Sequence, residues 1–171
     1  MIARTLKRAE VPEADEERVR LAWDALSQVE DPELPALSIV DLGMVRHVAA
    51  VGTPGGRVVE VGLTTTYSGC PATEVIRLAV ENALRDALVG EFRVKMVLAP
   101  AWTTDWITET GRSKLAAYGI VPPMQSVGLP LACPRCRSMD TQLLSEFGST
   151  PCKSLHRCRA CLEPFEQFKC L

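Results

Sequence analysis

The sequence predicts an α+β protein with a small metal-binding tail. Upstream of residue 125, apolar residues switch between helical and strand spacing in the order helix, β-hairpin, strand–helix–strand crossover and helix, which favours a two-layer core. Six of the seven cysteines lie within the last 39 residues, and four of these form two C-x-x-C pairs. We therefore expect a core domain over residues 1–125 and a zinc-ribbon-like domain over residues 131–171, joined by a proline-rich linker at 122–130.

The first half of the core is predicted to be a helix followed by a hairpin. Apolar residues recur at helical spacing over residues 13–29, and the helix should end before the prolines within residues 31–35. β-Branched residues then indicate one strand over residues 45–51 and a second over residues 58–66. Because a short glycine-rich turn connects these strands, they should pair as an antiparallel hairpin.

The second half of the core adds a crossover and a last helix. The clearest helix of the sequence begins directly after Cys70, and an alternating strand follows it over residues 92–98. Since a helix connects the second and third strands, they should lie parallel in one sheet. The last helix is expected to start from a cap at Thr103 or Thr104.

This topology predicts that four separate segments meet at one edge of the sheet. The carboxyl ends of the two parallel strands lie there, and so does the start of the antiparallel first strand. We expect Asp31, Asp41, Cys70 and the turn that begins at Trp102 to converge at this edge. Acidic residues beside prolines and glycines are commonly turn formers, so a structural role for the two aspartates stays open.

Cys70 is the candidate reactive residue of the core. At a helix start, unpaired backbone N–H groups and the helix dipole are expected to lower the pKa of its thiol, which makes a nucleophile and a ligand for a soft metal. The alternative is a small residue that fills a gap in the core. The hydroxyl-rich loop at residues 64–69 favours a ligand site over that alternative.

The cysteine-rich tail is predicted to hold a structural zinc ion. Two C-x-x-C pairs separated by 21 residues place four thiolates around one ion at tetrahedral geometry. Bound metal would supply much of the folding free energy of so small a segment. A disulfide framework is the less favoured alternative, because nothing in the sequence indicates export. The predicted ligands are Cys133, Cys136, Cys158 and Cys161. Three further residues are alternative ligands: Cys152, Cys170 and His156.

Several other classes of function are disfavoured. No apolar run approaches the length of about 18 residues that a membrane span requires, and no signal peptide is recognisable, so we expect a cytoplasmic protein with reduced thiols. The formal net charge is −2, and the segment 131–171 carries only 6 basic against 4 acidic residues, which is a weak case for nucleic-acid binding. The common nucleotide-binding and hydrolase motifs are absent, so independent catalysis is not expected.

Several motifs resemble those of a known family. Residues 31–35 (DPELP), 39–45 (IVDLGMV) and 64–71 (TTTYSGCP) resemble the MIP18 family, also called DUF59, whose members assist iron–sulfur cluster assembly. Residues 102–108 (WTTDWIT), residues 118–123 (YGIVPP) and the cysteine-rich tail are more specifically similar to the D-component family of bacterial phenylacetyl-CoA epoxidase systems. The resemblance therefore covers most of the chain.

This resemblance implies an accessory protein without catalytic activity of its own. Its role would be assembly or maturation of an iron–sulfur cluster in aerobic phenylacetate catabolism, with other subunits of the oxygenase system, especially the iron–sulfur reductase, as partners. The family's cysteine corresponds to Cys70, and its acidic motif residues to Asp31 and Asp41. A non-catalytic docking subunit is the alternative role. A thiol-disulfide enzyme would need a resolving cysteine from the tail.

The resemblance also leaves the cluster ligands open. A transient iron–sulfur cluster needs more ligands than the core's single cysteine supplies. A second copy in a homodimer, a partner or small thiol, or Cys152 and Cys170 of the tail would complete the set.

Overall fold

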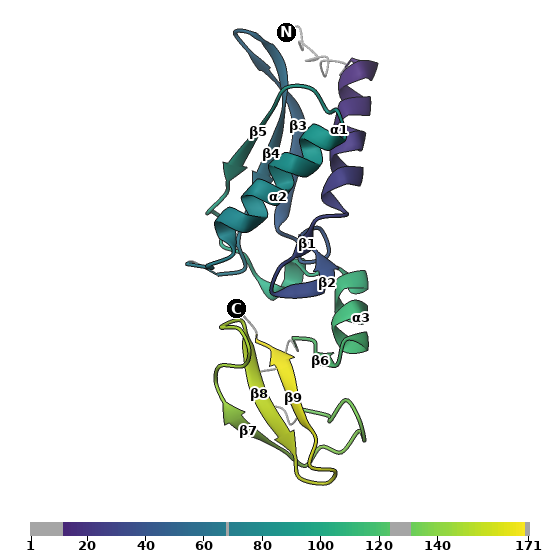
Figure 1. The fold of residues 1–171 in the computed structure, drawn as a ribbon, viewed down its shortest axis with the longest axis vertical. Helices are drawn as coiled ribbons and strands as arrows, with labels where there is room; N and C mark the ends of the chain where they lie inside the picture. The colour runs from purple at the N-terminus through teal and green to yellow at the C-terminus, as the bar shows by residue number, and fades with distance from the viewer. Residues whose placement is uncertain (1–11, 68, 124–130, 170–171) are drawn as a thin grey trace, which may run out of the picture.

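The structure, a computed structural model, describes residues 12–67, 69–123 and 131–169. It is a mixed α+β protein, as predicted. Figure 1 shows a helix-covered sheet at one end and the cysteine-rich sheet at the other. Between them lie helix α3 (Glu109–Ala117) and the paired strands β1 (Glu30–Asp31) and β2 (Leu34–Ser38). No helix within these described ranges is long and apolar enough to cross a membrane.

The core sheet has the predicted topology. Its three strands, β3 (Val45–Thr53), β4 (Gly56–Leu63) and β5 (Phe92–Met96), lie in the order β3-β4-β5. The β3–β4 pair is an antiparallel hairpin and β4 runs parallel to β5, so both pairing predictions are confirmed. Helices α1 (Glu13–Leu26) and α2 (Thr73–Asp86) pack against each other and against this sheet (Figure 1).

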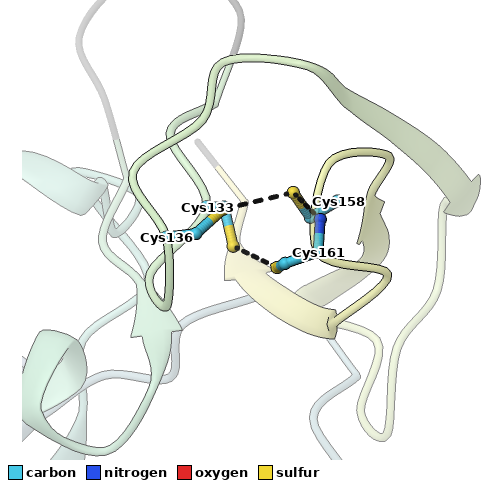
Figure 2. Close-up of side chains that lie close together, drawn as sticks. All are labelled: Cys133, Cys136, Cys158 and Cys161. Carbon is cyan, nitrogen blue, oxygen red and sulfur yellow. Dashed lines mark hydrogen bonds between the residues drawn. The ribbon is translucent and has the colours of Figure 1, made fainter.

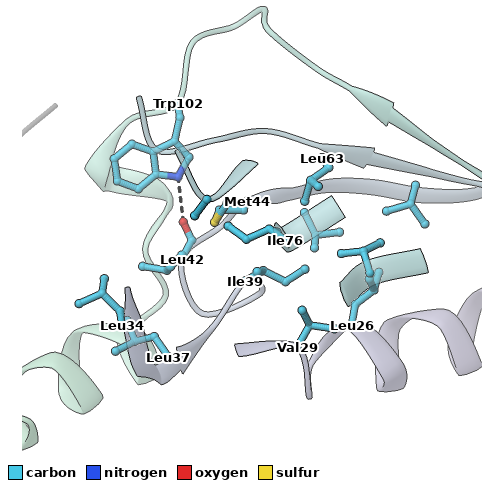
Figure 3. Packing of buried hydrophobic residues seen from close by; sticks show 14 of the residues in the cluster. Leu26, Val29, Leu34, Leu37, Ile39, Leu42, Met44, Leu63, Ile76 and Trp102 are labelled. Carbon is cyan, nitrogen blue, oxygen red and sulfur yellow. Dashed lines mark hydrogen bonds between the residues drawn. The ribbon is translucent and has the colours of Figure 1, made fainter. Parts of the chain in front are cut away.

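The core is filled by the apolar faces that the sequence periodicity identifies. Val59 and Val61 alternate inward along β4, while Ile76, Val80 and Leu84 of α2 recur at helical spacing. Each of these side chains is almost completely removed from solvent, which contributes about 1.5–3 kcal/mol per residue relative to an exposed position. Figure 3 shows the same core continuing toward Trp102.

A small strand pair that precedes β3 was not predicted from the sequence. Helix α1 ends at Leu26, earlier than predicted, and the chain then forms β1 (Glu30–Asp31) and β2 (Leu34–Ser38), which pair antiparallel. The β2 strand includes Pro35 and packs against α3. Strand β1 is too short to show periodicity, and the prolines in and before β2 made a strand there unexpected.

The region after β5 also differs from the prediction. A 3₁₀ turn, η1 (Thr104–Trp106), precedes α3 (Glu109–Ala117), so the predicted helix cap at Thr103 or Thr104 is wrong. The cap is Thr108, whose hydroxyl accepts the Gly111 N–H at 3.0 Å. The Thr108 N–H in turn donates to the Asp41 carbonyl at 2.9 Å, which holds the chain extended before α3 begins.

The tail folds into its own sheet and extends the core. Antiparallel strands β7 (Thr141–Ser145), β8 (Lys153–Cys158) and β9 (Pro164–Phe168) are joined by β6 (Ile120–Val121), which runs parallel to β9. Cys152 and Phe168 belong to the same buried cluster as the core residues. The tail therefore packs on the core rather than merely following it; most of the predicted linker, residues 124–130, lies outside the described residues.

Candidate functional site

The four predicted zinc ligands lie together (Figure 2). Their sulfur atoms are all within 4.8 Å of one another. The Sγ atoms of Cys133 and Cys161 are 3.7 Å apart, and those of Cys136 and Cys158 are 3.6 Å apart. Four zinc–sulfur bonds of ~2.3 Å at tetrahedral angles give sulfur–sulfur distances of about 3.8 Å. The cluster therefore has the size of a structural metal site.

The two C-x-x-C turns have the same backbone design. The residue after the second cysteine of each pair, Arg137 or Leu162, has a positive φ, 64° and 65° respectively. A positive φ is unfavourable for residues other than glycine. Because both turns adopt it at the same position, we infer that the geometry of the paired cysteines imposes it. The Cys161 N–H donates to the Cys158 sulfur at 3.4 Å, and this backbone contact lowers the pKa of Cys158 to about 7.

Two of the three alternative ligands, His156 and Cys152, lie outside the four-sulfur cluster. The His156 ring bonds with the Ser154 hydroxyl at 2.9 Å and stacks on Phe165, so the four-sulfur cluster does not include it. Cys152 is buried in the core cluster. Cys170 lies outside the described residues.

Cys70 lies in the turn between β4 and α2. Helix α2 begins at Thr73, so Cys70 precedes the N-cap residue, Ala72, by two positions. The Thr73 hydroxyl donates to the Cys70 carbonyl at 2.7 Å and fixes this turn. The Cys70 side chain is 8% exposed and packs with core residues.

The pKa of Cys70 is raised, so the predicted lowering is wrong. Burial is the largest cause, and the negative charges of Glu33 and Asp31 act in the same direction. The Ala72 N–H and a contact with Tyr67 lower the pKa, but by less than burial and the two carboxylates raise it. Helix α2 starts two residues later than expected, so the Cys70 sulfur lies farther from its N-terminus and the helix dipole lowers the pKa of the thiol less.

Asp31 lies near enough to Cys70 for its charge to act on the pKa of the thiol. Its Oδ1 accepts the N–H groups of Glu33 at 2.8 Å and Leu34 at 3.0 Å, so it also shapes the turn between β1 and β2. Burial raises the pKa of Asp31, although these two hydrogen bonds and the charge of Lys153 oppose the rise. The residue therefore combines a turn-forming role with a position near the thiol.

Asp41 is engaged in a different contact. Its carboxylate accepts the Ser38 N–H at 3.0 Å and forms an ion pair with Lys114 of α3 at 2.6 Å. Burial disfavours its charge, but the Lys114 and Ser38 contacts outweigh that effect and lower the pKa of Asp41. On the other side of this loop, the Trp102 Nε1–H donates to the Leu42 carbonyl at 2.8 Å. Asp41 and Trp102 are thus linked through the loop at Leu42, while Asp31 acts on the pKa of Cys70.

Two residues of the Cys70 site had no assigned role in the sequence. The Tyr67 hydroxyl is buried and contacts the Cys70 side chain. Burial, followed by the charges of Cys70, Glu33 and Cys152, raises the pKa of Tyr67 to about 12. Lys153 is buried with its ammonium group 3.0 Å from the Glu166 carboxylate. The motif TTTYSGCP contained Tyr67, but only the fold shows that Cys70 of the core and Cys152 of the tail both act on the pKa of its hydroxyl.

Comparisons with known proteins agree with both parts of this arrangement. Residues 21–97 match the family described as iron–sulfur cluster assembly protein, and residues 124–169 match the PaaD zinc beta ribbon domain. A crystal structure of a DUF59 domain of unknown function from Bacillus anthracis is 28% identical, covers 60% of this chain and 94% of that chain, and has a TM-score of 0.53. Fold and site therefore define a DUF59-type domain joined to a cysteine ribbon.

A relative that aligns with both parts of the chain identifies the family within this class of proteins. An Escherichia coli (strain K12) protein, provisionally named as the D component of 1,2-phenylacetyl-CoA epoxidase, is 49% identical over 159 residues, which are 90% of this chain and 94% of the relative. The chain belongs to the family of phenylacetyl-CoA epoxidase D components. The resemblance inferred from the sequence motifs is confirmed.

Proposed function

We propose that this chain is an accessory component of a phenylacetyl-CoA epoxidase system that takes part in iron–sulfur cluster assembly for a partner subunit. The name of its 49% identical relative supports the system, and the match of residues 21–97 to iron–sulfur assembly proteins supports the role. The observation that carries the proposal is the position of Cys70, the one cysteine within residues 21–97, beside Asp31.

The environment of Cys70 suits transient binding. A thiol with a raised pKa is protonated at neutral pH, so iron must displace its proton to bind. This displacement weakens the apparent affinity, and weak ligation favours handing a cluster on. The nearby Asp31 and Glu33 carboxylates are available to take up the released proton. The same protonation makes the unloaded thiol a poor nucleophile.

We assign a structural Zn²⁺ ion to the ribbon. Its ligands are Cys133, Cys136, Cys158 and Cys161, whose mutual distances fit tetrahedral zinc. Four protein ligands leave no open position for a substrate, so the ion has a folding role. In that role it holds β8 and β9, which carry Lys153 and Phe168 to the core.

The proposed partners are the other subunits of the oxygenase system, with the iron–sulfur reductase as the client. The alternative role is a docking subunit in which Cys70 only packs. Exposed apolar residues of α2, Val75 and Leu78, give such a protein a surface to dock with. The two roles differ in what they require of the Cys70 sulfur, and a homodimer is compatible with either.

Replacement of Cys70 distinguishes these roles. The test is co-expression of the reductase with wild-type chain, Cys70→Ser or Cys70→Ala, followed by measurement of iron and acid-labile sulfide in the purified reductase. Cluster maturation predicts a reductase depleted of both with either variant, while unchanged zinc in the variant chain shows that it is folded. A fully loaded reductase together with normal co-purification of the Cys70 variants would leave only the docking role.

A further inference from the structure

Strand β7 forms one edge of the ribbon sheet. The strand order in this sheet is β6-β9-β8-β7, so β7 pairs with β8 on one side, and no strand of the described chain pairs with its other side (Figure 1). In an antiparallel strand, alternate residues direct their N–H and C=O groups away from the neighbour that is already paired. The outer side of β7 therefore presents a row of backbone donors and acceptors to which a further strand can bond.

The other described sheet edges carry features that prevent pairing, whereas β7 does not. Edge strands are commonly protected by charged residues, by proline or by being very short. Strands β3 and β5 carry Arg46, Arg93 and Lys95, β2 includes Pro35, and β1 and β6 have two residues each. Strand β7 (TQLLS) has five residues, none of which is charged or proline. Its composition therefore permits pairing with another chain.

Two leucines make this edge apolar. The side chains of Leu143 and Leu144 are 50% and 48% exposed. The register between β7 and β8 has one irregularity, between Leu143 and Ser145, so Leu144 has no opposite residue on β8. This irregularity bends the strand without placing a charge on it. Burial of the exposed parts of both leucines would therefore favour association.

The edge is complementary to a second copy of itself. Two β7 strands that pair antiparallel are related by a two-fold axis, so each copy contributes the same residues to the contact. An axis near Leu143, the middle residue of the strand, brings the leucines of the two copies together. Thr141 at one end of the strand then lies near Ser145 of the other copy, and hydroxyl pairs across strands are favourable.

The charges at the two ends of β7 match in the same arrangement. Asp140 precedes the strand, with its carboxylate 3.9 Å from the Arg159 guanidinium. Glu146 follows the strand, and its carbonyl accepts a hydrogen bond from the Lys169 ammonium group at 3.2 Å. Antiparallel pairing places the Asp140 end of one copy against the Lys169 end of the other, at both ends of the contact. Each end then brings acidic and basic groups together, and this complementarity favours a second copy of the chain as the partner of β7.

We propose that the chain forms a symmetric dimer in which two β7 strands pair antiparallel and join the ribbon sheets into one continuous sheet. A strand of five residues is a small part of the roughly 20–30 residues that each partner contributes to a standard interface. The dimer is therefore weak, and its population depends on the concentration of the chain.

The dimer keeps the two Cys70 sites apart. Antiparallel strands of one sheet are related by a two-fold axis normal to the sheet, and in each copy the helix-covered core lies at one end of the ribbon (Figure 1). The two cores therefore extend in opposite directions. For the proposed function this means that a second copy does not complete the ligands of a cluster at Cys70, so each chain handles its own.

The experiment is sedimentation of the purified, zinc-loaded, full-length chain over a concentration series. The variants Leu143→Lys and Leu144→Lys place like charges near the axis, and we expect each to raise the dissociation constant of the dimer by about tenfold or more. Leu88→Lys, a change at an 85% exposed leucine of the core, is the matched control and should dimerise like the wild-type chain. The zinc content of each variant reports the fold of the ribbon.

A mixture of two charge variants tests the antiparallel pairing. Asp140→Arg and Lys169→Glu each put like charges at both ends of their own homodimer, whereas a dimer with one chain of each kind has opposite charges at both ends. We expect each variant alone to dimerise more weakly than the wild-type chain. The mixture should sediment with a higher average mass than either variant alone, because heterodimers form.

Three results would overturn the proposal. They are a wild-type chain that stays monomeric up to about 1 mM, zinc-loaded lysine variants that dimerise like the wild-type chain, and a mixture of charge variants without preference for heterodimers. Because these measurements use neither iron nor the reductase, their outcome is independent of the test of the proposed function.

Discussion

The ring of Trp102 lies 6.1 Å from the ring of Phe168, at an angle of 54° between the ring planes. Trp102 follows the core sheet, whereas Phe168 ends the last strand of the ribbon, and both are buried. This contact joins two segments that the sequence assigns to separate domains. The ribbon therefore stabilises the side of the core on which Cys70 lies.

Truncation of Phe168 should destabilise the whole chain. Phe168→Ala removes a fully buried ring from the shared cluster, and the expected loss is about 3–5 kcal/mol in the free energy of unfolding. The measurement is chemical denaturation followed by tryptophan fluorescence. Phe147→Ala is the control, because Phe147 is exposed on the ribbon and its loss should change stability by less than about 1 kcal/mol. Equal effects of the two variants would show that the ribbon and the core are not packed together.

Loss of the zinc ligands should unfold the ribbon and expose the Trp102 side of the core. Cys133→Ser removes a completely buried ligand from a site whose metal binding is expected to supply most of the folding free energy of the ribbon. We expect loss of about one zinc per chain and rapid proteolysis downstream of residue 131. Elemental analysis and limited proteolysis measure both effects.

The same experiment has an internal comparison. Cys152→Ser changes a ribbon cysteine that lies outside the four-sulfur cluster, so its zinc content should equal that of the wild-type chain. If Cys152→Ser lost zinc and Cys133→Ser kept it, the assignment of the ligands would be wrong.

The sequence predicted those parts of the fold that depend on local periodicity. Alternation in β4 and the apolar stripe of α2 identified both elements and their parallel crossover, because the spacing of apolar residues is a property of each segment alone. The β1–β2 pair and the β6–β9 pair were not predicted. Each pair includes a strand of only two residues, and β6 pairs with a strand more than 40 residues away. Neither pairing can therefore be recognised from a local sequence pattern.

The sequence predicted the group of four cysteines from their C-x-x-C spacing, which is local, but it predicted the wrong direction for the pKa shift of Cys70. The acidity of Cys70 depends on how deeply other segments bury it and on where Glu33 and Asp31 lie, and neither is encoded near residue 70. For the same reason the proximity of Cys152 to Tyr67 could not be inferred without the tertiary structure.

The Asp41–Lys114 ion pair should make stability depend on pH. The pKa of Asp41 is lower in the folded chain than its ordinary value of 3.8. The charged carboxylate therefore contributes stability above pH 3.8, and this contribution is lost as the pH falls through the pKa of Asp41 in the folded chain. Asp41→Asn should cost about 1 kcal/mol at neutral pH, since Lys114 is partly exposed, and should reduce the loss of stability in acid. Denaturation at several pH values measures this. Asp24→Asn, in an exposed pair with Arg20, should leave the pH profile unchanged.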